Sequence, residues 1–255
     1  FGALGIIWFF FWNKLVTSYP EDHKSISKEE LEYIRAQAPA NSAAPTIPFL
    51  KLINNGPFLA IAVATFCNNW ALFTFLSYLP KFISSPTEMG GLGVDLGSKV
   101  FILLILIPSI VSVISLMLGG ILADSLIKNG YKVIKVRKIV NTIGFFGSAL
   151  FLFLIPFQDS HIIIICLLCL TNLCTGIGAG GFGVNHADLG PKYTGSLVGI
   201  AGSLGMVAAI LSPMIAGTIL QITNSWTLIF NICSGVLIFG GIYYLLFASA
   251  DKQFK

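Results

Sequence analysis

The chain has 255 residues, of which 55% are hydrophobic and 10% are charged, and its mean hydropathy is +0.86. Because a soluble domain carries about 25% charged residues, this composition excludes a water-soluble enzyme, a disordered chain and a secreted disulfide scaffold. The lipid bilayer is therefore the solvent in which this chain has to fold.

Long uncharged segments dominate the sequence. A membrane-crossing helix needs about 20 apolar residues, and six segments of roughly that length or more contain no Asp, Glu, Lys or Arg: 57–79, 100–123, 139–157, 162–184, 195–222 and 226–248. A seventh, 2–18, is apolar except for Lys14. These segments are too long to be barrel strands, and they lack the alternation of apolar and polar residues that such strands show. Since backbone groups in lipid must bond within their own segment, we predict an all-α integral membrane protein.

Phe1 already lies inside an apolar segment, without the basic start and the cleavage site of a signal peptide. We therefore expect a longer protein whose missing part lies upstream. At the other end of the predicted bundle, residues 249–255 form a polar tail. Only residues 158–161 join the segments 139–157 and 162–184, so we expect these two helices to be antiparallel neighbours.

The polar residues 19–56 separate the first apolar segment from the six-helix bundle predicted over 57–248. Ser27 and Glu30 have the spacing of a capping box and predict a short amphipathic helix that ends near Ala38. Pro39, Pro45 and Pro48 stop this helix. A tether between two helical bundles explains the segment more simply than a site for a partner protein.

Basic residues gather on one side of the predicted membrane, and this sets the orientation. Lys81 and Lys99 are alone on the other side, whereas the crowded side has the rest and should be cytosolic, or the equivalent compartment of an organelle. The crowded side carries Lys14, Lys24, Lys28, Arg35, Lys51, Lys128, Lys132, Lys135, Arg137, Lys138, Lys192, Lys252 and Lys255. The net charge of +4 therefore reflects topology, and it does not indicate nucleic-acid binding.

The cysteines all fall within predicted membrane helices. Cys166 and Cys169 have C-x-x-C spacing, but no second pair or His cluster accompanies them. We expect small buried thiols that pack between helices, with no disulfide, metal or cofactor. The other three are Cys67, Cys174 and Cys233.

Asn68, Asn69 and Trp70 lie near the middle of the segment 57–79. Strongly polar groups at this depth are functional candidates by default, although hydrogen bonds between helices are an equally good explanation for either Asn alone. Neighbouring positions on a helix differ by about 100°. One Asn is therefore expected to line a cavity while the other bonds to a neighbouring helix.

Residues 178–183 satisfy the pattern G-x-G-x-x-G. A dinucleotide-binding fingerprint has to follow a strand and open a helix, so this match inside a membrane helix is rejected. Glycines at a spacing of four, such as the pairs Gly176/Gly180 and Gly195/Gly199, instead predict closely packed helices that can also bend and slide.

Charged and titratable residues cluster at helix ends on the basic side. His186 and Asp188 are a candidate proton relay, although a hydrogen-bond network that ties the segments 162–184 and 195–222 is the simpler explanation. Gly120 and Asp124 end one helix, and Arg137 and Lys138 begin the next. These four are a candidate conformational latch, with a solvated loop as the alternative.

These patterns together resemble the C-terminal half of a major facilitator superfamily transporter. Within it they are most similar to the anion and phosphate transporter family, which contains sialin, the vesicular glutamate transporters, sodium–phosphate cotransporters and plant plastid phosphate transporters. The segments that carry the resemblance are 20–34, 66–70, 120–138, 184–200 and 246–252.

The resemblance implies a twelve-helix fold, with residues 1–18 as the end of the sixth helix, and alternating access coupled to Na⁺ or H⁺. Vesicular glutamate transporters have an arginine where this chain has Asn68, which argues against glutamate and favours phosphate or another organic anion. The membrane of residence stays open between plasma membrane, plastid, vesicle and lysosome.

An anion at the membrane midplane needs positive compensation, yet none of the six segments carries a charge. We therefore expect the cationic clamp and the coupling acid in the absent half. Asn68, Asn69 and Asn185 are the predicted neutral substrate ligands, and Trp70 is a predicted wall. A lipid-modifying membrane enzyme that uses His186 and Asp188, and an ion channel, are the weaker alternatives.

Overall fold

The computed structural model describes residues 2–37 and 49–254, and every regular element in these two ranges is a helix. The chain divides into two compact units, Phe1–Pro45 and Thr46–Lys255. The predicted end of the linker helix at Ala38 and the prolines Pro39, Pro45 and Pro48 lie outside the described residues.

The first unit contains α1 (Gly2–Leu15), the short turn η1 (Pro20–Asp22) and α2 (Lys28–Gln37). The predicted cap is present: the backbone N–H of Glu30 donates to Ser27 Oγ at 3.1 Å. Arg35 pairs with Glu21 at 2.9 Å and lowers the pKa of that carboxyl below its usual value. Because both side chains are exposed, this ion pair adds little to stability.

The second unit holds the helices that are long and apolar enough to cross a membrane, six in the described part of the chain. They are α4 (Gly56–Ser84), α5 (Lys99–Lys128), α6 (Val133–Leu154), α7 (His161–Phe182), α9 (Thr194–Thr223) and α10 (Trp226–Phe247). The shorter elements are α3 (Phe49–Ile53), η2 (Thr87–Met89), η3 (Ile155–Phe157), α8 (Asn185–Leu189) and η4 (Pro191–Tyr193).

All six uncharged segments are therefore confirmed as helices, but three of these helices extend about five residues or more beyond a predicted end. α4 runs on through Pro80 to Ser84, α5 continues to Lys128, and α6 begins six residues before the predicted start at 139. The reason is physical: Lys and Arg do not end a helix where it leaves the hydrocarbon, because their long side chains reach the polar interface.

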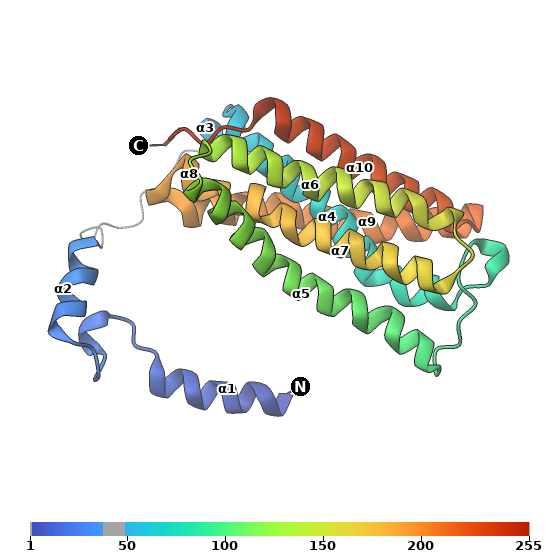
Figure 1. Ribbon diagram of the computed structural model, residues 1–255, viewed down its shortest axis with the longest axis horizontal. Coiled ribbons are helices and arrows are strands. Elements are labelled where there is room, and N and C mark those ends of the chain that lie inside the picture. Colours follow the sequence, from blue (N-terminus) through green and yellow to red (C-terminus); the bar gives the residue numbers. More distant parts are fainter. Residues whose placement is uncertain (1, 38–48, 255) are drawn as a thin grey trace. The chain divides into compact units, whose positions relative to one another are not determined.

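Helices that are neighbours in sequence are mostly not the closest neighbours in space (Figure 1). α4 packs chiefly against α9 and α10, α7 packs against α5 and α6, and α6 lies beside α10. Exchanging the triplet α4–α5–α6 with α7–α9–α10 turns the pair α4–α9 into α7–α5 and the pair α4–α10 into α7–α6, and it leaves the pair α6–α10 unchanged. This is the pattern of two interlocked three-helix repeats. The predicted pairing of α6 with α7 is confirmed.

Small residues set the closest helix contacts. A Cβ built on Gly176 of α7 would overlap the side chain of Ser115 on α5, and one on Gly180 would meet the backbone of Gly119. The close packing predicted for this glycine pair is confirmed. The other pair differs: Cβ atoms on Gly195 and Gly199 would meet no described atom within 4 Å.

α5 and α9 are buried far less than the other long helices. Within their most apolar stretches only 17% of α5 and 22% of α9 is buried, against 39–44% for the other four. Both helices therefore present broad apolar faces that the described residues do not cover.

We predict that Gly176→Leu lowers stability by about 1–3 kcal/mol, because the larger side chain forces α5 and α7 apart. Thermal unfolding of the detergent-purified protein measures the effect. Gly235→Leu is the matched control, since a Cβ there meets no described atom within 4 Å. Equal melting temperatures for the two variants would contradict the packing described here.

Candidate functional site

Asn68, Asn69 and Trp70 point to three different places, as their 100° spacing requires. Asn68 lines a cavity of about 260 Å³ between α4, α5 and α7. The Asn69 amide faces α9, where a Cβ on Gly205 would lie 2.8 Å from its Nδ2. Trp70 lines a separate narrow cavity between α4, α9 and α10.

We call the first of these the polar cavity. Its uncharged polar groups come from three helices: Asn68 from α4, Ser109 and Ser112 from α5, and Thr171, Asn172 and Thr175 from α7. The remaining lining is apolar: Ala71, Leu72, Phe75, Leu76, Leu79, Pro108, Leu152, Leu168 and Leu237. No Asp, Glu, Lys, Arg or His of the described chain lines this cavity.

Most polar groups of the cavity already hydrogen-bond to their own helix. Asn172 Nδ2 donates to the carbonyl of Leu168 at 2.9 Å, and Ser109 Oγ donates to that of Ile105 at 2.7 Å. These bonds use the hydroxyl proton of Ser109 and one of the two amide protons of Asn172, so the second amide proton, the side-chain oxygen of Asn172 and the hydroxyl lone pairs stay available to a ligand. The Asn68 amide and the Ser112 hydroxyl are the exceptions, because neither group has a hydrogen-bond partner among the described residues.

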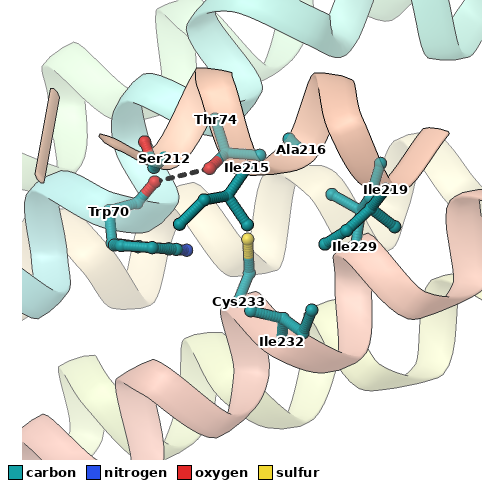
Figure 2. Close-up of a pocket in the computed structure, with 9 residues that line it drawn as sticks. All are labelled: Trp70, Thr74, Ser212, Ile215, Ala216, Ile219, Ile229, Ile232 and Cys233. Carbon is teal, nitrogen blue, oxygen red and sulfur yellow. Dashed lines mark hydrogen bonds between the residues drawn. The ribbon is translucent and has the colours of Figure 1, made fainter. Parts of the chain in front are cut away.

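The narrow cavity is of a different kind. It has a volume of about 10 Å³, close to that of a single water site. Figure 2 shows Thr74 donating to the backbone carbonyl of Trp70, a bond of 2.7 Å, with Ser212 beside them. Ser212 Oγ is buried and has no hydrogen-bond partner among the described residues. This space is too small for an anion, so Trp70 is not a wall of a substrate-sized cavity in this conformation.

Asn185 lies elsewhere in the bundle, at its basic end. This is the end that carries the α5–α6 loop, α8 and residues 249–254. Asn185 is fully buried, and its Nδ2 donates to Tyr244 Oη of α10 at 2.8 Å. The structure therefore does not bring together the four predicted substrate residues; of these, Asn68 alone lines the polar cavity.

Arg137 has a different acidic partner from the one expected. Its Nε donates to Asp188 Oδ2 at 2.8 Å, its Nη2 to Oδ1 at 3.3 Å and its Nη1 to the carbonyl of Gly180 at 3.2 Å. The side chains of Arg137 and Asp188 are only 11% and 18% exposed. This bidentate pair joins the start of α6 to α8.

The other members of the predicted latch are not part of this pair. Asp124 is exposed and has no ion pair among the described residues. Gly120 faces open space, whereas its neighbour Gly119 packs against α7. Lys138 lies along a groove between α6 and α10. The start of α6 packs against the end of α5 through apolar side chains, Val136 and Val140 against Ala123, whereas the Arg137 guanidinium is directed to the other side, towards Gly180 of α7 and Asp188 of α8.

His186 and Asp188 do not form an exposed catalytic pair. His186 is 5% exposed, and its Nδ1 lies 3.3 Å from the carbonyl of Gly183. The acceptors of Asp188 are taken by Arg137. A hydrogen-bond network is present here: it ties α8 and the end of α7 to α6 and α10, whereas the expected tie was between α7 and α9.

The cysteines are free thiols. Cys67, Cys174 and Cys233 are buried as predicted, whereas Cys166 is exposed and Cys169 is half-buried. Within residues 2–37 and 49–254, no three His, Cys, Asp or Glu side chains come close enough to hold a metal ion.

Comparison with known proteins shows to which family the chain belongs. The profile of the Major Facilitator Superfamily matches residues 1–213. The chain is 30% identical over 262 residues to the chloroplastic ascorbate transporter of Arabidopsis thaliana, covering 99% of this chain and 45% of the relative.

Two further relatives give the same picture. Human sialin is 32% identical over 261 residues, 99% of this chain and 51% of its own. The chloroplastic sodium-dependent phosphate transport protein 1 of Arabidopsis thaliana is 30% identical over 253 residues, and the match covers 99% of this chain and 48% of the relative. The chain thus spans about half the length of the curated relatives it matches. It is an all-helical, multi-pass integral membrane protein, and it belongs to the Major Facilitator Superfamily.

Proposed function

We propose that this chain is the C-terminal half of a secondary active carrier that moves a small anion across a membrane by alternating access. In this proposal residues 1–18 end the sixth helix, 19–56 link the two halves, 57–248 form the second bundle and 249–255 are a cytosolic tail. The single observation that carries it is the uncharged polar cavity between α4, α5 and α7. The names of the relatives, which describe transporters and not enzymes, support it.

The uncharged lining of the cavity supports different roles for the two halves of the proposed carrier. A cavity that holds an anion at membrane depth needs positive charge nearby, and no charged described residue lines this one. Neutral donors, with the Asn68 amide first, would orient the anion, and the cationic clamp and the coupling acid would come from the other half. The apolar faces of α5 and α9, which the described residues leave uncovered, are where that half would pack.

Inorganic phosphate is the first candidate for the anion, and an organic anion is the second. Uptake by the full-length protein in proteoliposomes tests this, with labelled phosphate, ascorbate, sialate and glutamate and with the Na⁺ and H⁺ gradients varied separately. We expect phosphate uptake that one of the two gradients drives. Faster uptake of an organic anion would overturn the preference for phosphate, and no gradient-driven uptake of any anion would overturn the proposed function.

We predict that Asn68→Ala in the full-length protein raises KM for the transported anion about tenfold. A hydrogen bond to a charged group contributes about 1.5–3 kcal/mol, and removing this amide deletes donors that have no partner within the described chain. Uptake kinetics at equal expression give the measurement. Asn129→Ala, an exposed loop amide, is the matched control, and an unchanged KM for Asn68→Ala would remove that residue from the site.

We also propose the Arg137–Asp188 pair as the conformational latch of this half. Removing either partner leaves a largely buried charge alone, which costs about 3 kcal/mol. Arg137→Ala and Asp188→Ala should therefore each lower the melting temperature, and the double variant should lose less than the sum of the two. Strictly additive losses would show that the two side chains do not act as a pair.

A further inference from the structure

A groove on the outside of the bundle runs between α6 and α10 at the basic end, and the transport function does not use it. Its volume is about 460 Å³. It is lined by Ile134, Lys135, Lys138, Ile139, Thr142 and Ile143 of α6 and by Leu245 of α10. We call it the α6–α10 groove.

Two lysines lie at the end of this groove that is nearer the start of α6. Lys135 and Lys138 are three residues apart on α6 and therefore share one face of the helix. The ion pairs found among the described residues involve neither of them. Lys135 Nζ lies 5.4 Å from the ring centroid of Tyr131, which holds the ammonium group at the rim without neutralising it.

The floor of the groove is apolar and open. Ile143 is 40% exposed, and Ile139 and Leu245 are half-exposed beside it. Ile143 lies five residues beyond Lys138, or about 7.5 Å further along the helix axis. From Lys135 onwards the groove thus changes from positive to apolar, in the direction that leads from the membrane surface into the hydrocarbon.

The length of α6 places this change at the height of the lipid headgroups. The uncharged residues 139–157, which directly follow the two lysines, span about 28 Å as a helix, and the hydrocarbon core of a bilayer is about 30 Å thick. The first turns of α6, which carry both lysines, therefore lie at one interface. Positive side chains over an apolar slot at that depth match the two parts of a phospholipid, a phosphate and an acyl chain.

We propose that the α6–α10 groove binds an anionic phospholipid. Lys135 and Lys138 hold the headgroup phosphate, and one acyl chain lies along Ile139, Ile143 and Leu245. A free inorganic phosphate would satisfy the lysines but leave the apolar floor uncovered, so the occupant is a lipid. The proposal rests on the membrane embedding of the chain and not on which anion it transports.

Native mass spectrometry of the full-length detergent-purified protein tests the proposal, with dioleoyl phosphatidylglycerol added stepwise. Dioleoyl phosphatidylcholine and inorganic phosphate are the comparison ligands. We expect retained phosphatidylglycerol on the unaltered protein, at least tenfold weaker retention of phosphatidylcholine, and no effect of millimolar phosphate on the bound lipid.

Three variants separate a built site from general attraction to a basic surface. Lys135→Gln/Lys138→Gln should weaken phosphatidylglycerol binding about tenfold. Lys128→Gln/Lys132→Gln removes the same amount of charge from the same basic end of the bundle, but neither residue lines the groove. This variant should therefore bind phosphatidylglycerol almost as well as the unaltered protein does. Ile143→Trp keeps both lysines and fills the apolar floor, and it should also lose the lipid.

Equal losses from the two lysine pairs would overturn the proposal, because the lipid would then sense only the net charge of the loop. Normal binding by Ile143→Trp would overturn it as well, since no acyl chain would then occupy the floor. Displacement of the lipid by millimolar phosphate would show an anion site without a lipid. The melting temperature of each variant is measured alongside, so that a loss of binding is scored only for protein that remains folded.

Discussion

Close backbone approach between helices is the constraint on which this structure depends. In lipid, helices gain nothing from hiding apolar side chains from one another, so their association rests on packing and on interhelical hydrogen bonds. The contacts of Gly176 and Gly180 with α5, and of Gly178 with Gly144 on α6, allow α7 to lie flush against two helices at once. The polar cavity exists because α7, held in this way, faces α4 across a gap that side chains do not fill.

The distribution of charge follows from the same solvent. The polar cavity is lined by amides and hydroxyls, which the membrane interior tolerates at moderate cost. The largely buried ion pair, Arg137 with Asp188, instead sits at the end of the bundle, where α6 begins. There each charge has its partner, and a backbone carbonyl takes a third hydrogen bond of the guanidinium. Because the charged pair lies at the basic end of the bundle and only neutral polar groups line the cavity, no charged side chain of this half competes with a bound ion there.

Much of the fold could be predicted from the sequence, because the bilayer imposes simple rules of length and polarity. The six apolar segments, the cap at Ser27 and the pairing of α6 with α7 follow from such rules. The divergence of Asn68, Asn69 and Trp70 follows from helix geometry alone.

What the sequence does not provide is the identity of the facing helix. Asn172 and Thr175 are visible as polar residues in an apolar segment, but nothing local shows that they face Asn68 and the serines of α5. Asp188 is 51 residues from Arg137, whereas Asp124 is far nearer in sequence and looked the better partner. The preference for the nearer residue failed because α6 and α7 are antiparallel neighbours, so that the start of α6 lies beside the end of α7 and the following helix α8.

The interlocked packing also has a consequence for how the protein is made. α4 enters the membrane first of the six long helices, but its main partners, α9 and α10, are the last to be synthesised. At about 5–20 residues per second, the ribosome needs roughly ten to thirty seconds to pass from the end of α4 to the end of α10. During that interval the Asn68 and Asn69 amides of α4 lie in lipid without α9, the helix that will cover Asn69. Nascent chains are therefore most exposed to quality control before the α9–α10 hairpin is inserted.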